Sequence, residues 1–177
     1  MKAEVIALGE NHHGTHTKAI RKFLATSQQF NGVFEEWAQD YQLSADYYLK
    51  TGKLDQDLGG FFDRATIRSN PIRESSILLL DYARENNLPL ICVDSSLVKT
   101  EKYSHQSPIN HFFIAGESRD EDMFNSVREH LKDGERWLLL GGIEHLRPGL
   151  HFRSGYKTLG ERLYEWLGNG FELVVLK

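Results

Sequence analysis

The chain has 177 residues, enough for one domain with a sizeable core, and its 40% hydrophobic and 26% charged residues are typical of globular proteins. A net charge of −4 provides no general attraction to nucleic acid, and no apolar run approaches the roughly 20 residues that span a bilayer. The single cysteine, Cys92, excludes an internal disulfide, and the first residues show no signal peptide pattern. We therefore expect a cytoplasmic protein whose partners are neither nucleic acids nor membranes.

Short apolar runs alternate with helix-like stretches along the chain. The expected strands are residues 5–8, 32–34, 88–93, 137–140 and 171–176. The expected helices are residues 15–27, 43–50, 71–86, 119–132 and 157–167. Two linking regions, 54–70 and 95–117, are less regular and are expected to form lids or pocket walls. This order predicts a single α/β domain over residues 1–177, with a mostly parallel central sheet of about five strands flanked by helices. Helical insertions are expected to form a crevice at the carboxyl ends of the strands.

The first expected strand is followed at once by Glu10 and then by three histidines, His12, His13 and His16. Ligands of open α/β sheets bind at the carboxyl ends of the strands, so we expect part of this cluster to face a crevice. One histidine could act as a general base that a carboxylate orients, or Glu and His could bind a divalent metal. The alternative is a polar turn whose histidines cap the next helix. His12 and His16 share a helix face only if that helix begins early.

Carboxylates also follow the second and third expected strands. Glu35 and Glu36 come directly after residues 32–34, and a buried carboxylate needs a partner. We expect Glu36 to begin a solvated loop, whereas Glu35 faces either that loop or the same crevice as Glu10. Asp94 ends the third strand, where it either orients a histidine or arginine or forms an Asx turn.

Arginines beside such a crevice could neutralise its carboxylates or bind an anionic or carbonyl-bearing substrate. The candidates are Arg68, Arg73 and Arg119. We expect Arg119 to open the helix 119–132, where the acidic residues that follow suit the helix dipole. A cation at a helix start does not suit that dipole, so Arg119 is expected to pair with a crevice carboxylate.

The fourth expected strand ends in Gly141 and Gly142, which allow close approach of the backbone. The placement of His145 just after this strand predicts a role in the site, whereas Glu144 is expected to point away. Patterns of other site types are absent from the sequence. It contains no phosphate-binding GxGxxG or GxxxxGK[ST], no GxSxG serine elbow and no HExxH zinc motif.

These segments together resemble one broad group of protein families. Residues 8–16, Leu-Gly-Glu-Asn-His-His-Gly-Thr-His, resemble the Gly-Glu-x-x-His-Gly segment of erythromycin esterase-like proteins and the Gly-Glu-x-His segment of ChaN-like haem-binding proteins. The same group includes the TIKI/TraB metallopeptidase-like proteins. Further similar segments, in the same order, are Phe34-Glu35-Glu36, residues 68–73, residues 88–94, the Arg-Asp-x-x-Met segment 119–123 and the Gly-x-x-His element 142–145. The resemblance implies a largely parallel α/β core and a crevice built from Glu10, His12 or His13, Glu35 and His145.

The first functional hypothesis is a hydrolase of an ester or amide bond, with a small molecule or peptide as substrate. Here His13 or His12 deprotonates water, Glu10 orients the histidine or the water, and Glu35 tunes the pKa of the base. His145 or an arginine stabilises the oxyanion. In a metal-assisted version the ligands of a divalent ion are Glu10, His12, His13, Glu35 and His145. The expected substrate-binding residues are His12, His16, Arg68, Arg73, Asp94 and Arg119.

The alternative hypothesis is a haem- or small-ligand-binding protein of the ChaN-like type. His12, His13 or Tyr103 could then be an axial ligand of the haem iron. A catalytically inactive regulatory domain is a third hypothesis. The density of Glu and His at strand ends argues against it, because burying such groups without a purpose is costly.

Overall fold

The computed structural model describes residues 2–11, 16–27, 29–67, 72–96, 108–149 and 156–176, with side chains described outside 64–67, 72–73 and 108–117. Five strands form one sheet: β1 (Glu4–Glu10), β2 (Gly32–Ala38), β3 (Leu90–Asp94), β4 (Arg136–Gly142) and β5 (Phe171–Val175). Every neighbouring pair is parallel, and the strand order is β3-β2-β4-β1-β5. The predicted α/β fold with a parallel sheet of about five strands is therefore confirmed.

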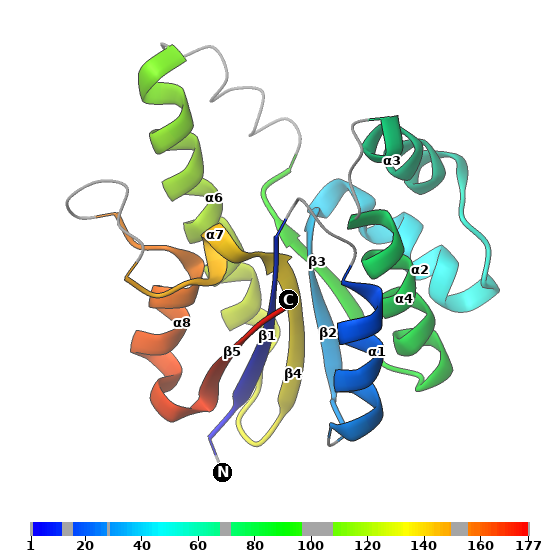
Figure 1. The fold of residues 1–177 in the computed structure, drawn as a ribbon, viewed down its shortest axis with the longest axis horizontal. Coiled ribbons are helices and arrows are strands. Elements are labelled where there is room, and N and C mark those ends of the chain that lie inside the picture. The colour runs from blue at the N-terminus through cyan, green and yellow to red at the C-terminus, as the bar shows by residue number, and fades with distance from the viewer. Residues whose placement is uncertain are drawn as a thin grey trace.

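Helices pack on both faces of this sheet (Figure 1). The described helices are α1 (Thr17–Thr26), α2 (Gln42–Thr51), α3 (Gln56–Ile67), α4 (Ile72–Glu85), α6 (Pro108–His130), α7 (Ile143–Leu146) and α8 (Leu159–Leu167), with short 3-10 turns η1 (Gln39–Tyr41) and η2 (Gly168–Gly170). Helices α1 to α4 lie on one side of the sheet, and α6 and α8 lie on the other (Figure 1). Within the described residues, no helix has both the length and the apolar character that a membrane span needs.

Neighbouring strands in the middle of the sheet send the chain to opposite faces. After β1 and β2 the chain continues into the layer of α1 to α4, whereas after β3 and β4 it continues into α6, α7 and α8. Because β4 lies between β1 and β2, the connections diverge on both sides of its carboxyl end. Such points of divergence are where open α/β sheets bind ligands.

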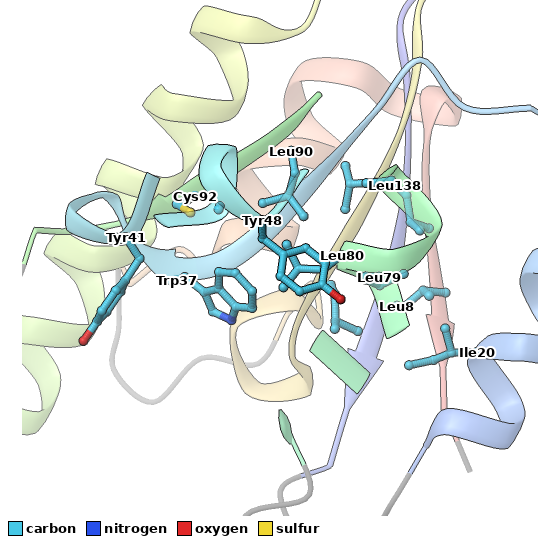
Figure 2. Packing of buried hydrophobic residues seen from close by; sticks show 14 of the residues in the cluster. Leu8, Ile20, Trp37, Tyr41, Tyr48, Leu79, Leu80, Leu90, Cys92 and Leu138 are labelled. Carbon is cyan, nitrogen blue, oxygen red and sulfur yellow. The ribbon is translucent and has the colours of Figure 1, made fainter. Parts of the chain in front are cut away.

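Alternation along the strands divides the core into two layers. Ile6, Leu8 and Leu138 pack against α1 and α4 on one face of the sheet, where Figure 2 shows Leu8 close to Ile20 and Leu79. On the opposite face the core contains Val5, Ala7, Phe34 and Leu139, together with Met123 and Val127 from α6 and Leu163 from α8. Each strand therefore contributes side chains to both layers, which explains why the sequence shows nearly continuous apolar runs.

The region 54–70, expected to be irregular, contains the helix α3. The Asp55 side chain accepts a hydrogen bond from the Leu58 amide at 2.9 Å, so it caps the helix, and Leu58 and Phe62 are fully buried on one helix face. The pair Gly59 and Gly60 favours a loop by propensity alone, but burial of this apolar face outweighs that preference. The expectation of an irregular segment was therefore wrong here.

The helix expected over 119–132 begins earlier, at Pro108, and ends at His130. Proline suits the first helical turn because its missing amide donor would have had no partner there. Arg119 therefore lies inside α6 rather than at its start, and the acidic residues after it do not face a helix amino terminus. The dipole explanation for that acidic cluster was wrong.

Helix α7, which carries His145, is held by direct contact with α8. A Cβ atom on Gly160 would lie 1.8 Å from the Leu146 carbonyl oxygen, so only glycine permits this approach of the two helices. Thr158 caps α8 by accepting a hydrogen bond from the Glu161 amide, and its hydroxyl donates to the Arg147 carbonyl at 3.1 Å. The turn after β4 is thus fixed against the start of α8.

Candidate functional site

Glu10 at the carboxyl end of β1 and Glu35 within β2 lie on the same face of the sheet. Leu8 and Glu35 both pair with Leu140 of β4, so Glu35 is level with Leu8 and Glu10 lies two residues further along the same face. Their residues are only 4% and 1% exposed, respectively. Two carboxyl groups buried this closely need hydrogen-bond donors or protons.

The surroundings of Glu35 favour the protonated form of its carboxyl group. The Ser76 hydroxyl of α4 donates to its Oε1 at 2.6 Å, while Oε2 is buried and has no hydrogen-bond partner among the described residues. Burial raises the pKa of Glu35 well above its ordinary value, and the charges of Glu10 and Glu36 raise it further, whereas the Ser76 bond only partly opposes them. Glu35 therefore holds its proton more tightly than an ordinary carboxyl group does.

Glu10 has a pKa close to neutrality. Burial raises this pKa to about 7; the nearby Ser75 hydroxyl acts to lower it, and the charge of Glu36 adds to the rise. Ser75, like Ser76, is fully buried on α4, so this helix places one hydroxyl group near each carboxyl, although only Ser76 makes a hydrogen bond of normal length, to Glu35. A carboxyl group with such a pKa exchanges its proton readily at neutral pH, as a general base must.

Glu36 faces the opposite side of the sheet and makes three polar contacts. Its Oε2 accepts a hydrogen bond from the Gly142 amide at 2.6 Å, and its Oε1 lies 3.3 Å from Arg119 Nη2 and 3.6 Å from His145 Nε2. The expectation that Glu36 begins a solvated loop was wrong, because β2 continues to Ala38. Glu36 is instead the anion around which a charged group assembles.

Gly141 makes room for this anion. A Cβ atom at position 141 would lie 2.8 Å from Glu36 Oε2, closer than a carbon and an oxygen can pack. The paired glycines were expected to allow close approach of the backbone at the end of β4. In the structure Gly141 leaves space that the Glu36 side chain fills. The structural effect of the two glycines is to seat Glu36 against the Gly142 amide.

Arg119 from α6 joins the carboxyl ends of β2 and β3. Its Nε lies 3.0 Å from Asp94 Oδ1 and its Nη2 lies 2.5 Å from Asp94 Oδ2, a two-point ion pair, while Nη2 also contacts Glu36. Asp94 additionally accepts the Ser95 amide hydrogen at 2.7 Å. Of the alternatives weighed for Asp94, the arginine partner is therefore present, whereas the bond from the adjacent Ser95 amide is not the bond to the second residue on that defines an Asx turn.

His145 lies between two carboxylates. Its Nδ1 is 2.6 Å from Asp120 Oδ1, and its Nε2 faces Glu36. Burial acts to lower the pKa of His145, and so does the charge of Arg119, but the charge of Glu36 and the hydrogen bond and charge of Asp120 outweigh them and raise it to about 9. His145 is therefore an imidazolium cation at neutral pH and cannot serve there as a general base.

Glu36 links the two groups of residues across the sheet. Its charge raises the pKa of Glu10 and Glu35 on one face and that of His145 on the other. This part of the sheet thus combines a carboxyl whose pKa is about 7, a carboxyl whose pKa burial raises well above its ordinary value, and a partly buried cation. Strongly shifted pKa values with identifiable partners are typical of functional sites.

Several predicted site residues lie elsewhere or outside the description. The His16 ring is buried just before α1, with Nε2 3.1 Å from the Asn11 carbonyl oxygen, so it fastens the end of β1 to the start of the helix. Because α1 begins at Thr17, His16 is not on a helix face that His12 could share. His12, His13 and Arg68 lie outside the described residues, as does the side chain of Arg73.

The described residues by themselves do not fit a metal centre. Among them, no group of three or more His, Cys, Asp or Glu side chains could hold a metal ion. Both ring nitrogens of His145 face carboxylates, and the Arg119 guanidinium lies against the same Glu36 oxygen. The five-ligand site predicted from Glu10, His12, His13, Glu35 and His145 stays a prediction, because two of its members lie outside the description. The same holds for the haem ligands, since Tyr103 also lies outside it.

Sequence reasoning missed five residues that contact the site. These are Ser75, Ser76, Glu36, Asp120 and Tyr156. The continued apolar pattern after Glu36, in Trp37 and Ala38, was the available signal that β2 extends and places Glu36 on its second face. No signal of similar strength marks Tyr156, which is distant from the site in sequence.

These features define an α/β domain with one parallel sheet and a charged carboxyl edge, and solved bacterial structures share its fold. Over 99% of this chain, a structure titled "Bacterial protein toxins" gives a TM-score of 0.63 at 16% identity. RRSP, a MARTX toxin effector domain from Vibrio vulnificus CMCP6, gives 0.64 at 17% over the same share, and a Bacillus cereus protein gives 0.58 at 16%.

The likeness to these structures shows a shared fold alone. The chain spans 34% and 33% of the two toxin chains and 66% of the Bacillus cereus chain. No protein-family model and no curated protein matches the sequence. Membership of the erythromycin esterase/ChaN-like group therefore stays a prediction from the sequence motifs.

Proposed function

We propose that the protein is a hydrolase that activates water at the carboxyl ends of β1, β2 and β4 to cleave an ester or amide bond. The observation that carries the proposal is that Glu10, whose pKa is about 7, ends β1, and that His145, whose pKa is about 9, follows the neighbouring strand β4. Between these values one group is an available base while the other is still a cation. Environments that push two titratable groups apart in this way are typical of acid–base catalysis.

Glu10 is the base in this proposal. Its carboxylate takes a proton from water while the water oxygen adds to the carbonyl carbon of the substrate. When the tetrahedral intermediate collapses, the bond to the leaving oxygen or nitrogen breaks and the proton returns from Glu10 to that atom. The sequence hypothesis gave the proton transfer to His12 or His13; the pKa of Glu10 favours the carboxyl itself.

Glu35 supports this step as a neutral acid. Ser76 occupies its Oε1, so the buried Oε2 is the atom left to hydrogen-bond water or Glu10. A protonated Glu35 adds no negative charge beside the attacking water. A charged one would raise the pKa of Glu10 further and weaken its ability to exist as a carboxylate near pH 7.

His145 provides the positive charge for the oxyanion. An imidazolium held between Glu36 and Asp120 is fixed in place before the reaction, so little reorganisation is needed when negative charge develops on the carbonyl oxygen. Arg119 is less available for this role because Asp94 occupies its Nε and Nη2. We therefore assign the oxyanion contact to His145.

The test uses a panel of p-nitrophenyl esters and a p-nitroanilide with the wild type, Glu10→Gln and His145→Gln. Glu144→Gln is the matched control, because Glu144 is exposed on the same short helix. We expect the first two variants to lose about 100-fold or more in kcat and the control to retain full activity. A wild type that hydrolyses no compound faster than Glu10→Gln would contradict the proposal.

A further inference from the structure

Asp120 is a carboxylate whose complete burial needs an explanation. It lies on α6, is 0% exposed, and accepts a hydrogen bond from His145 Nδ1 at 2.6 Å. Its neighbour Glu121 is exposed on the same helix. Burying a charged side chain is costly unless it is paired and hydrogen-bonded, so the position of Asp120 depends on the partners that it meets inside the protein.

The second partner of Asp120 is Tyr156. Its hydroxyl donates a short hydrogen bond to Asp120 Oδ2, and the Tyr156 residue is itself only 8% exposed. Each carboxylate oxygen thus has its own donor, the imidazole on Oδ1 and the phenol on Oδ2. The carboxylate is held at both ends and cannot rotate without breaking one of these bonds.

The two donors come from segments that are fixed to each other. His145 is on α7, and Tyr156 precedes Thr158, whose hydroxyl donates to the Arg147 carbonyl just after α7. Asp120 reaches both donors from α6 on the same side of the sheet. One buried carboxylate therefore connects α6, α7 and the segment before α8.

The arrangement leaves His145 one orientation. With Nδ1 bound to Asp120, the opposite ring nitrogen, Nε2, faces Glu36 at 3.6 Å. Two neighbouring residues of α6 contact different parts of the site. Arg119 forms ion pairs with Glu36 and Asp94, whereas Asp120 binds the imidazole. The ring can then present its Nε2–H only toward the carboxyl edge of the sheet.

We propose that Asp120 and Tyr156 are positioning residues that lock the imidazole of His145 with Nδ1–H bound inside the protein and Nε2–H directed toward the carboxyl edge of the sheet. The inference deepens the proposed hydrolase, on which its catalytic meaning rests, but its geometric content stands by itself. Neither residue touches the substrate. Asp120 acts through His145, and Tyr156 acts through Asp120.

The first readout is the ¹H and ¹⁵N spectrum of the histidine rings in the full-length protein, with His145→Gln used to assign the His145 signals. We expect a far-downfield proton on Nδ1 that exchanges slowly with water, because its acceptor is buried. Asp120→Asn should shift this proton upfield or remove it. Tyr156→Phe should keep it and speed its exchange about tenfold or more, and Glu121→Gln should leave it unchanged.

Two results would overturn the inference. One is a wild-type His145 ring that carries no proton on Nδ1, and the other is an Asp120→Asn spectrum with the wild-type Nδ1–H signal. If circular dichroism shows that Asp120→Asn does not fold, Tyr156→Phe decides, and an unchanged exchange rate there contradicts the locked carboxylate.

Turnover provides the second readout and separates this inference from the proposed function. In folded Asp120→Asn we expect kcat to fall about tenfold or more while KM stays within about twofold, because the oxyanion contact is misplaced and substrate binding is not. Unchanged kcat in a folded variant with a shifted ring signal would contradict the positioning role. Absence of turnover in the wild type would contradict the hydrolase, whereas the ring spectrum would still decide the orientation of His145.

Discussion

At the scale of single residues, Glu10 and His145 set the chemistry available at the carboxyl edge of the sheet. Burial raises the pKa of Glu10 to about 7. For His145, neighbouring carboxylates overcome the effect of burial and raise the pKa to about 9. The two groups are therefore a carboxylate and a cation together only in the interval between these values. The same burial that prepares Glu10 for proton transfer also destabilises its charged form.

This cost predicts how stability depends on pH. A carboxyl group whose pKa is higher in the folded state binds its proton more tightly when the protein is folded. Its contribution to the free energy of unfolding is therefore fully present below pH 4.5 and is lost as the pH rises through about 7. Glu10→Gln lacks this loss. We expect the variant to be about 3 kcal/mol more stable than the wild type at pH 8 and nearly equal at pH 4.5, measured by urea unfolding.

The matched control is Glu144→Gln, because that side chain is exposed. Its free energy of unfolding should follow the wild-type curve at both pH values. If Glu10→Gln were no more stable than the wild type at pH 8, the raised pKa of Glu10 would be refuted.

At the scale of elements, β4 gives the site its shape through residues that carry no side chain. Gly141 allows the Glu36 carboxylate to reach the Gly142 amide. In Gly141→Ala the new methyl group must displace this carboxylate, which is the flexible end of a side chain, so the fold itself survives. We expect a loss of about 1–2 kcal/mol in the free energy of unfolding and a larger proportional loss of turnover. Full activity in the variant would contradict the role of Glu36 as the anion beside Arg119 and His145.

In helix α3 we expect a glycine-to-alanine substitution to stabilise the protein rather than destabilise it. A Cβ atom on Gly59 would meet nothing within 4 Å, and the residue lies inside the helix. Gly59→Ala should therefore raise the free energy of unfolding by about 0.5–1 kcal/mol, because alanine loses less conformational entropy in a helix. Thermal melts of the two alanine variants measure both effects. A destabilised Gly59→Ala would contradict the helical assignment of this segment.

The elements also show how far the sequence could be interpreted. All five strands were predicted because apolar runs bounded by polar residues are a strong signal for buried parallel strands. Helix α3 was missed because paired glycines lower helix propensity, and the deciding contribution, burial of Leu58 and Phe62, is tertiary. Glu10 and His145 lie, as predicted, at or just after strand ends, whereas Glu35, expected after its strand, lies inside β2. The partners Asp120 and Tyr156 could not be found, since their roles depend on how α6 and α8 pack rather than on local sequence.

At the scale of the whole molecule, the sheet joins two core layers, and we expect the two layers to unfold together. Leu138 and Leu139 are adjacent in β4, and both are fully buried, one in each layer. We expect Leu138→Ala and Leu139→Ala each to lose about 2–5 kcal/mol, with circular dichroism and tryptophan fluorescence giving one shared transition in each variant. Separate transitions for the two probes would show that the layers unfold independently.

The same joint architecture places the site where it is. Connections diverge to opposite faces beside β4, so α4 brings hydroxyls to Glu10 and Glu35 from one side while α6 brings Arg119 and Asp120 from the other. Glu36 in β2 connects these two sets through its charge. A site assembled from both layers should lose its function when either layer is loosened, even though no single element contains it.

The pH dependence of kcat/KM tests the central claim most directly, with the most reactive ester of the panel and with Glu10→Gln measured beside the wild type. The account predicts a bell-shaped profile that rises as Glu10 loses its proton near pH 7 and falls as His145 loses its own near pH 9, with no comparable activity in the variant. Two results would contradict it: a wild-type profile that stays flat at the background rate from about pH 6 to about pH 10, or a variant as active as the wild type.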